Sequence, residues 1–263
     1  MIPRLHVPVT EPEDVVKCLG KQERDWKEGR SAHALASLWF DHNDFPPRVR
    51  ALLDSHAKFK TAELVDAFFE RQVDLKSAGR PSQTDLLVVA GVGDSIAILG
   101  VEGKAGEPFG QRVSDWNDSP GKEARLDSLC KMLDLDAKET DALRYQLLHR
   151  TASVLLEAKR YRAKDAVLIV HAFGEDAASF EDFSDFVQAL GFEKPFIGKL
   201  TGPLDRDGVS LYVGWAGDEA PRSDGQGDYL ERLRAYTSRV AENCRRVDAW
   251  CESRMSAAKN SAE

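Results

Sequence analysis

The chain has 263 residues, of which 42% are hydrophobic and 30% charged, so a chain disordered throughout is excluded. Its formal net charge of −8 argues against a protein that coats nucleic acid by bulk charge, although a local basic groove stays compatible with it. No run approaches the roughly 18 apolar residues of a membrane span, and the N-terminus shows no apolar signal-peptide core. We therefore expect a soluble, cytoplasmic protein that does not enter membranes.

The first 58 residues predict a helical N-terminal extension. Thr10 to Glu13 have the spacing of a capping box, Ser31 opens a helix that runs to Phe40, and Pro46-Pro47 starts another. The four cysteines show no CxxC spacing and have no companion histidines, which disfavours a zinc site.

A stronger helix is predicted over residues 61–73, because its apolar side chains recur at i, i+1, i+4 and i+5. These side chains are Leu64, Val65, Phe68 and Phe69. On such a helix Glu63 and Glu70 lie together on another face.

Two β-rich runs follow, at residues 84–90 and 95–105, and they predict a hairpin. With a two-residue turn at Val92-Gly93, Asp85 lies opposite Gly100 and diagonal to Glu102. Because positions two apart in a strand share a face, Asp85, Glu102 and Lys104 then project from one side. Both faces of the hairpin are otherwise apolar, which is typical of strands in the centre of a sheet flanked by helices.

The rest of the chain alternates between helical and β-rich segments. Helices are predicted over 122–134, 137–160 and 179–190, strands over 165–173 and 209–215, a loop over 216–227, and a last helix over 227–254. The expected organisation is a single α/β domain over 1–254, with a core over 59–216 and a tail over 255–263. The last helix is expected to dock on the body or to pair two subunits as a homodimer.

The pattern Asp/Glu-x-Lys occurs five times and carries little information alone. Only Glu102-Gly103-Lys104 ends one β-run that follows another. Two carboxylates and a lysine at the ends of central strands are costly to bury unless they are paired or bind a metal. A surface ion pair of Lys104 with Glu102 or Asp85 is the alternative interpretation.

Residues 81–85 (PSQTD), the 17-residue step to Glu102, and Glu102-Gly103-Lys104 resemble the signature of the PD-(D/E)XK, restriction-endonuclease-like superfamily. The acidic helix before this segment and the helix and strand after it match the order of that superfamily's core, over roughly residues 60–172. One departure is that three residues separate Pro81 from Asp85. The whole chain further resembles an uncharacterised bacterial family of this fold.

The resemblance implies an α/β fold with a central mixed sheet flanked by helices and with helical additions at both ends. It implies that Asp85 and Glu102 hold Mg²⁺ or Mn²⁺, and that Lys104 orients or helps to deprotonate the attacking water. The first helix of this fold often adds a carboxylate, which implies Glu63 or Glu70, and we take Glu63 as the expected third metal ligand.

Three further segments carry weaker signals. Gln146, His149 and Arg150 share a helical stripe with Ser153 that holds no carboxylate, so they are candidate substrate-binding residues or an ordinary polar face. The basic run at 159–164 suits a nucleic-acid backbone, but favourable charges at a helix C-terminus explain it better. His171, at the end of an apolar strand, is more typical of a hydrogen-bonded core histidine than of a catalyst.

These observations predict a Mg²⁺-dependent phosphodiesterase that acts on DNA or RNA. The alternative is a binding or regulatory module on a degenerate nuclease-like fold, which the acidic pI of about 5.4 favours. Hydrolysis of a small phosphorylated substrate is a third possibility, because it tolerates an acidic surface.

Overall fold

The computed structural model describes residues 9, 11–19, 26–42, 44–77 and 79–219. The chain divides into two units, Met1–Pro221 and Arg222–Glu263, and all described residues belong to the first. The helix expected over 227–254, its proposed role in a homodimer, and the tail over 255–263 lie outside the described residues.

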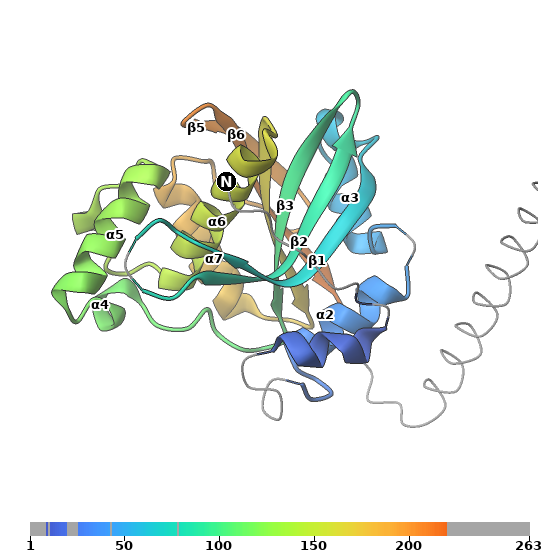
Figure 1. Cartoon of the computed structure of the whole chain (residues 1–263), viewed down its shortest axis with the longest axis horizontal. Coiled ribbons are helices and arrows are strands. Elements are labelled where there is room, and N and C mark those ends of the chain that lie inside the picture. Colours follow the sequence, from blue (N-terminus) through green and yellow to red (C-terminus); the bar gives the residue numbers. More distant parts are fainter. Residues whose placement is uncertain (1–8, 10, 20–25, 43, 78, 220–263) are drawn as a thin grey trace, which may run out of the picture. The chain divides into compact units, whose positions relative to one another are not determined.

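A six-stranded mixed sheet forms the centre of the described unit, with the strand order β1-β2-β3-β4-β6-β5 (Figure 1). Its strands are β1 (Glu63–Val73), β2 (Ser82–Val92), β3 (Ser95–Lys104), β4 (Asp165–Phe173), β5 (Leu200–Arg206) and β6 (Val209–Asp218). The first three strands are antiparallel neighbours, β4 is parallel to both β3 and β6, and β5 is antiparallel to β6. The expectation of an α/β fold around a central mixed sheet is confirmed.

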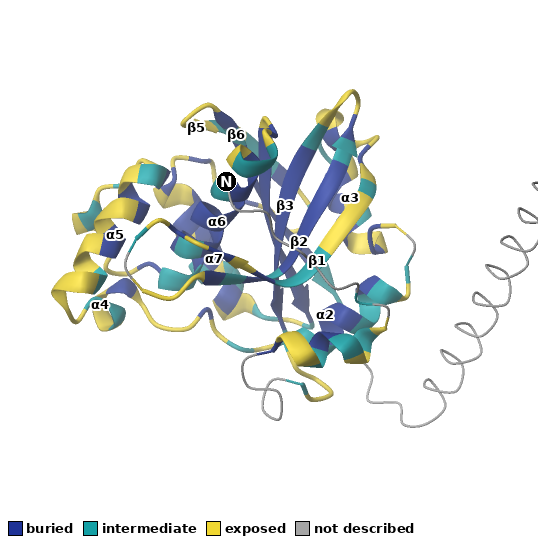
Figure 2. Cartoon of the chain, viewed as in Figure 1, coloured by how far each residue is buried: buried dark blue, intermediate teal, exposed yellow. Residues whose placement is uncertain are grey.

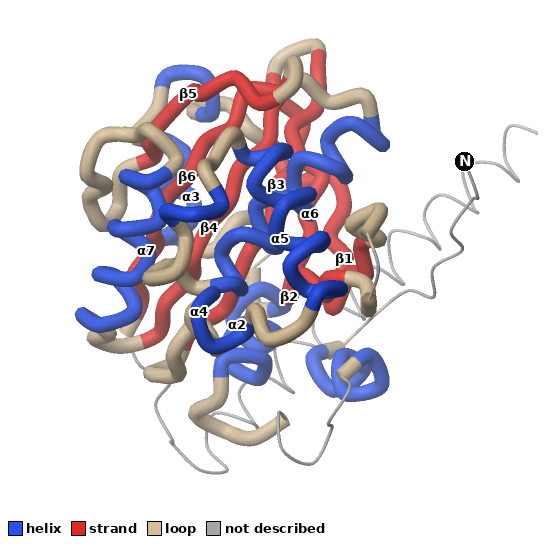
Figure 3. The backbone as a smooth tube through the Cα atoms, turned by 90° about the vertical axis from the view of Figure 1, so that its left-hand side faces the viewer, coloured by secondary structure: helices blue, strands red, loops and turns tan. Residues whose placement is uncertain are grey.

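Helices cover both faces of this sheet. One side carries α4 (Val113–Trp116), α5 (Pro120–Leu133), α6 (Tyr145–Tyr161) and α7 (Ala177–Ala189), which lie in front of the sheet in Figure 3. The other side carries α2 (Ser31–Phe40), α3 (Pro47–Asp54) and the short 3₁₀ helix η2 (Ala57–Phe59). The remaining 3₁₀ helices are η1 (Pro12–Cys18) and η3 (Ala137–Glu139).

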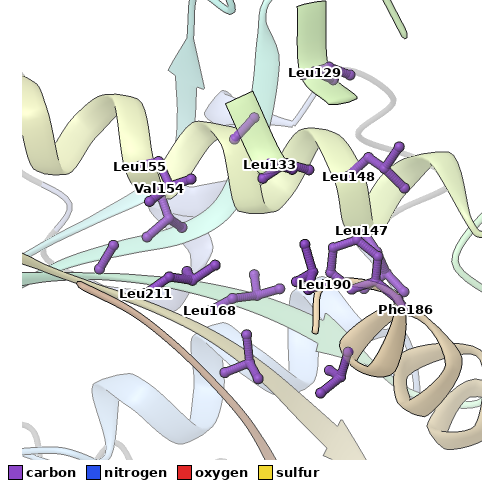
Figure 4. Packing of buried hydrophobic residues seen from close by; sticks show 14 of the residues in the cluster. Leu129, Leu133, Leu147, Leu148, Val154, Leu155, Leu168, Phe186, Leu190 and Leu211 are labelled. Carbon is purple, nitrogen blue, oxygen red and sulfur yellow. The ribbon is translucent and has the colours of Figure 1, made fainter. Parts of the chain in front are cut away.

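Two hydrophobic clusters hold these layers together, one on each face of the sheet. On the α6 face, leucines of α5 and α6 meet strand residues such as Leu168 and Leu211 (Figure 4). On the opposite face, Leu35 and Leu52 pack on the strands, so the helices within residues 1–58 form a layer of the core rather than an extension. The central strands are buried along most of their length (Figure 2).

Helix α6 lies very close to strand β3 because Gly100 has no side chain. A Cβ atom built on Gly100 would stand 2.1 Å from Cγ2 of Val154 on α6. A residue with a Cβ atom could stand here only if the Val154 side chain or the helix that carries it shifted. Gly100 therefore sets the separation between α6 and the strand that carries Glu102 and Lys104.

The prediction of a helix over residues 61–73 is wrong, because residues 63–73 form the edge strand β1. Its register on β2 shifts between Leu64 and Asp66, and Glu70 has a left-handed backbone with φ 52°. Each irregularity displaces the period-2 alternation of a strand, so the apolar side chains take on a spacing that imitates a helix.

The hairpin of β2 and β3 is confirmed, but its turn lies one residue later than expected. Val92 pairs with Ser95, and Gly93-Asp94 form the turn. Paired residue numbers therefore sum to 187 rather than 185. Continuing this register one residue beyond the last pair, Leu86 and Val101, places Asp85 directly opposite Glu102.

Three other boundaries differ from the sequence expectation. The helix predicted over 137–160 is divided into η3 and α6, with an irregular segment between them. Strand β5 was not predicted, because Pro203 and few apolar residues make it an atypical strand at the edge of the sheet. Strand β6 continues to Asp218, three residues into the predicted loop.

The remaining predictions agree with the structure at the level of element type. The helices expected from Ser31, Pro46-Pro47 and residue 122, and the strand over 165–173, are all present. Helix α7 begins two residues earlier than predicted, at Ala177, and Asp176 caps it, since its side chain accepts a hydrogen bond from the Ser179 N–H. Among the described residues no helix is both long and apolar enough to span a membrane.

Candidate functional site

Asp85, Glu102 and Lys104 converge at one end of the β2–β3 hairpin, on the floor of a cleft of about 790 Å³. Glu102 and Lys104 stand two residues apart on β3, and Lys104 Nζ donates to Glu102 Oε1 across 2.9 Å. Asp85 Oδ2 accepts a hydrogen bond from the backbone N–H of Gly103 across 3.0 Å. This bond lies just beyond Leu86 and Val101, the last backbone pair between β2 and β3. The three residues predicted to act together therefore do lie together.

Helix α6 adds two side chains to these three. Arg150 donates to Asp85 Oδ1 across 3.1 Å and also to Glu102 Oε2, so its guanidinium lies between the two carboxylates. Gln146 donates to Glu102 Oε1, while its own Oε1 accepts from Lys104 across 3.3 Å. The stripe on α6 thus faces the carboxylates instead of solvent.

His149, the third predicted substrate-binding residue, lies at the side of the cleft. Its Nδ1 is 2.9 Å from Ser82 Oγ, which accepts a hydrogen bond from Arg150 across 3.2 Å. The Ser82 hydroxyl proton is thereby directed to His149 Nδ1, which favours the neutral ring. Burial and the neighbouring Arg150 charge hold the pKa of His149 well below its ordinary value, so it is uncharged at neutral pH.

Glu70 is the alternative to Glu63 as the third carboxylate that the resemblance implies. In the β1–β2 register it lies across from Asp85, and its Oε2 accepts from Gln83 Nε2 across 2.6 Å. Phe69 packs on the α2 side of the sheet, whereas Arg71 pairs with Glu157 of α6. The left-handed backbone at Glu70 therefore marks the point where the strand turns over and brings this carboxylate into the cleft.

Glu63, the expected third metal ligand, lies away from the site. It is exposed at the start of β1, where it pairs with Gly91 near the turn end of the hairpin. The expectation failed because residues 61–73 form a strand, in which Glu63 and Glu70 are about seven rises of 3.3 Å apart rather than two turns of a helix. The signal that favours Glu70 is its position beside Asp85, which only the pairing of β1 with β2 reveals.

The three carboxylates of the cleft have different pKa values because their charged neighbours differ. Burial, with the charge of Glu102 nearby, raises the pKa of Asp85 to about 7, and burial beside Asp85 raises the pKa of Glu70 to about 8. Burial alone would raise the pKa of Glu102, but Arg150 and Lys104 outweigh it and hold that pKa at about 2. Glu102 is therefore ionised, while Asp85 and Glu70 lose their protons only near neutral pH and above it.

These pKa shifts follow from the balance of positive and negative charge among the buried side chains of the cleft. Three carboxylates, Glu70, Asp85 and Glu102, face two cations, Lys104 and Arg150. When all three carboxylates are ionised, the cluster carries one negative charge in excess. An additional cation near Asp85 would lower the pKa of both Asp85 and Glu70.

The donor set suits Mg²⁺ or Mn²⁺, since every candidate ligand is an oxygen atom. No group of three or more His, Cys, Asp or Glu side chains in the described part of the chain is arranged so that it could hold a metal ion. Mg²⁺, however, is commonly held by one or two carboxylates together with water and phosphate oxygens. Asp85 and Glu102 would supply two such carboxylates, each in exchange for its contact with Arg150.

His171 and the basic run at 159–164 stand apart from this cleft. Trp39 Nε1 donates to His171 Nδ1 across 3.2 Å, and His171 Nε2 therefore donates to Asp218, 3.0 Å away. His171 is the hydrogen-bonded core histidine that the sequence predicts. Lys159, in the basic run, pairs with Asp207 instead of facing the cleft.

Comparison with protein families gives a match over most of the chain. A family described as "Domain of unknown function (DUF6946)" matches residues 8–220. The chain belongs to this family. Comparisons with curated proteins and with solved structures give no match. The family match spans the whole sheet and every residue of the cleft described above.

Proposed function

We propose that the protein is a Mg²⁺- or Mn²⁺-dependent phosphodiesterase of the PD-(D/E)XK type that hydrolyses nucleic acid. The observation that carries the proposal is the convergence of Asp85, Glu102 and Lys104 on the floor of one cleft. Carboxylates and a lysine in this arrangement are suited to phosphoryl chemistry, in which charge develops on phosphate oxygens and must be stabilised.

The order of elements supports the same proposal. Helices α2 and α3 precede three antiparallel strands, α6 crosses from β3 to β4, and β4 lies parallel to β3. Strand β1 stands where the resemblance implied an acidic helix, but the hairpin, the later helix and the strand after it follow the implied order. The carboxylate and lysine positions fall on the second and third strands, as the resemblance implies.

Each side chain has a distinct role in this proposal. Asp85 and Glu102 hold the cation, which supplies charge stabilisation and a more acidic water when bound. Lys104, whose ammonium lies 2.9 Å from Glu102, places a positive charge beside the phosphate without competing as a ligand. Gln146 holds both Glu102 and Lys104 in position through one amide group.

The mouth of the cleft offers further contacts for a phosphate-bearing substrate. Exposed Arg30 and the first residues of α2 line it together with Gln146, His149 and Arg150 of α6. The first backbone N–H groups of a helix favour anions, and no side chain caps this helix. A strand of nucleic acid can therefore pass between α2 and α6 over Asp85.

Metal-dependent cleavage tests the proposal. Purified protein is incubated with single-stranded and duplex DNA and RNA in Mg²⁺ or Mn²⁺, beside Asp85→Asn and Lys104→Ala with circular dichroism as a check on folding. The proposal requires cleavage by the wild type that both folded variants lose.

The position of Arg150 favours a second function, that of a binding or regulatory module without catalysis. Its guanidinium already supplies the cation between Asp85 and Glu102. Calorimetric titration with Mg²⁺ or Mn²⁺ separates the two functions. A metal site gives heat that Asp85→Asn removes and that Glu63→Gln, at the far end of β1, leaves unchanged. A module whose cation is Arg150 gives no such heat.

A further inference from the structure

A second hollow of about 540 Å³ adjoins the cleft, and its volume lies within the roughly 300–1,000 Å³ typical of ligand pockets. It lies between the residues that lead into β2, the start of α5 and the first turn of α6. Gln83, Trp116, Tyr145 and His149 line both the hollow and the cleft. A polymer bound over Asp85 would therefore continue into this hollow, which we name the side pocket.

The charge of the side pocket is opposite to that of the whole chain. Arg80, Lys122 and Arg125 line it, and among the described residues no Asp or Glu does. Arg80 is exposed, and the Lys122 side chain is 36% exposed and pairs across 2.9 Å with Asp118, whose side chain is 64% exposed. A phosphate that binds Lys122 would replace this exposed carboxylate, because a surface pair of this kind is weak. In a chain of net charge −8, this is a focused cationic site for an anion.

One wall of the side pocket is aromatic. The rings of Trp116 and Tyr145 stack with centroids 3.5 Å apart and planes 10° from parallel, and both residues are only half-buried. Arg125 is buried and holds this wall in place, because its Nε donates to Tyr145 Oη across 2.8 Å. Its guanidinium also donates to the Arg80 carbonyl across 2.9 Å, which fixes the loop that carries Arg80.

We propose that the side pocket binds the nucleotide next to the one at Asp85, so that the protein acts on single-stranded nucleic acid. Arg80 and Lys122 contact the phosphate, and the base lies against the edges of the Trp116–Tyr145 stack. Aromatic contact of this kind needs a base that is not paired, because a duplex hides base faces in its own stack. This inference rests on the proposed function and names the substrate class of that site.

Fluorescence anisotropy with labelled dT12 and rU12 tests the inference in EDTA, where binding is measured without cleavage. The paired change Arg80→Ala with Lys122→Ala is expected to weaken binding about tenfold or more and to reduce the salt dependence by about 0.7 per lost phosphate contact. The paired change Lys131→Ala with Lys138→Ala removes the same two positive charges from exposed positions on α5 and η3, outside the side pocket, and is expected to change the Kd less than about twofold. Equal losses in both would show a bulk charge effect and overturn the inference.

Two further probes examine the base and the strand. Trp116→Leu is expected to weaken binding of dT12 about tenfold, whereas Phe196→Ala, at a ring 69% exposed on another surface, is expected to leave it unchanged. A 12-base-pair duplex should bind at least tenfold more weakly than dT12. Equal binding of duplex and single strand, or dTMP binding as tightly as dT12, would overturn the assignment.

These outcomes are separate from those of the proposed function. Binding of dT12 that depends on Arg80 and Lys122, without cleavage in any metal, would support the side pocket and contradict the hydrolase. Metal-dependent cleavage that is unaffected by the Arg80 and Lys122 changes would support the hydrolase and contradict the side pocket.

Discussion

Arg150 of α6 donates to Asp85 of β2 across 3.1 Å, and this pair joins a helix and a strand that lie 65 residues apart in the chain. The same guanidinium binds Glu102, whose side chain is only 2% exposed. Helix α6 therefore both packs on the hydrophobic core and, through Arg150, neutralises the carboxylates of the cleft. The stability of the fold and the chemistry of the cleft are therefore coupled through Arg150.

Replacing Arg150 should lower the free energy of unfolding substantially, because Arg150 is buried against two carboxylates. Arg150→Met leaves Glu102 buried with one partner fewer, and loss of one member of a buried pair typically costs about 3–5 kcal/mol. In Arg150→Met with Glu102→Gln, the uncompensated charge is gone, so the double variant should be more stable than the sum of the single changes predicts. Urea denaturation measures all four proteins, and strictly additive losses would show that the two residues do not interact.

The raised pKa values of Asp85 and Glu70 predict how stability depends on pH. The folded protein keeps protons on these carboxyls up to about pH 7 to 8, whereas the unfolded chain releases them near pH 4. Folded molecules thus bind more protons across this window, so the free energy of unfolding should fall as the pH rises from about 5 to about 8. Glu102, with its pKa lowered to about 2, contributes stability that is lost only in strong acid.

Urea denaturation at pH 5, 6, 7 and 8 without divalent cations measures this trend. Glu70→Gln cannot ionise and should flatten the fall in stability. Glu63→Gln removes an equivalent carboxylate from the exposed end of the same strand and should keep the wild-type slope. A wild-type slope in Glu70→Gln would mean that Glu70 does not titrate in this range.

Gly100 should be intolerant of even one methyl group. In Gly100→Ala the new Cβ would meet Val154 Cγ2 at 2.1 Å, so the Val154 side chain or α6 itself must shift. Overpacking of this kind costs about 1–3 kcal/mol, and the displacement would also separate Arg150 and Gln146 from Glu102. Val154→Ala in the same chain should restore most of the loss.

A matched glycine provides the control for this experiment. Gly121, in the first turn of α5, has no atom within 4 Å of a built Cβ, so Gly121→Ala should be neutral or slightly stabilising. If Gly100→Ala proved as stable as Gly121→Ala, the close approach of α6 to β3 would be in doubt.

Much of the site could be predicted from the sequence, because it depends on a pattern of residues that lie close together in the chain. The hairpin follows from two apolar runs around a turn, and parity alone places Asp85, Glu102 and Lys104 together. A turn misplaced by one residue shifts the sum of paired numbers by two, which preserves the parity. The common face therefore survived an error in register.

What could not be predicted depends on contacts between distant segments. The positive φ of Glu70 and the register shift after Leu64 break the strand pattern locally, and only pairing with β2 identifies β1 as a strand. The polar stripe on α6 was visible in the sequence, but nothing local indicated that Arg150 would lie between two carboxylates. The cationic side pocket likewise joins Arg80, which precedes β2, to Lys122 and Arg125 of α5.

The most direct test of the central claim is the rate at which a labelled oligonucleotide is cleaved with Mg²⁺ or Mn²⁺ and with EDTA. The wild type should cleave only with metal, and Asp85→Asn and Lys104→Ala should each be slower by at least about 100-fold while staying folded. Glu63→Gln should retain the wild-type rate. No cleavage by the wild type of any single-stranded or duplex substrate, or cleavage that Asp85→Asn and Lys104→Ala leave intact, would contradict the account.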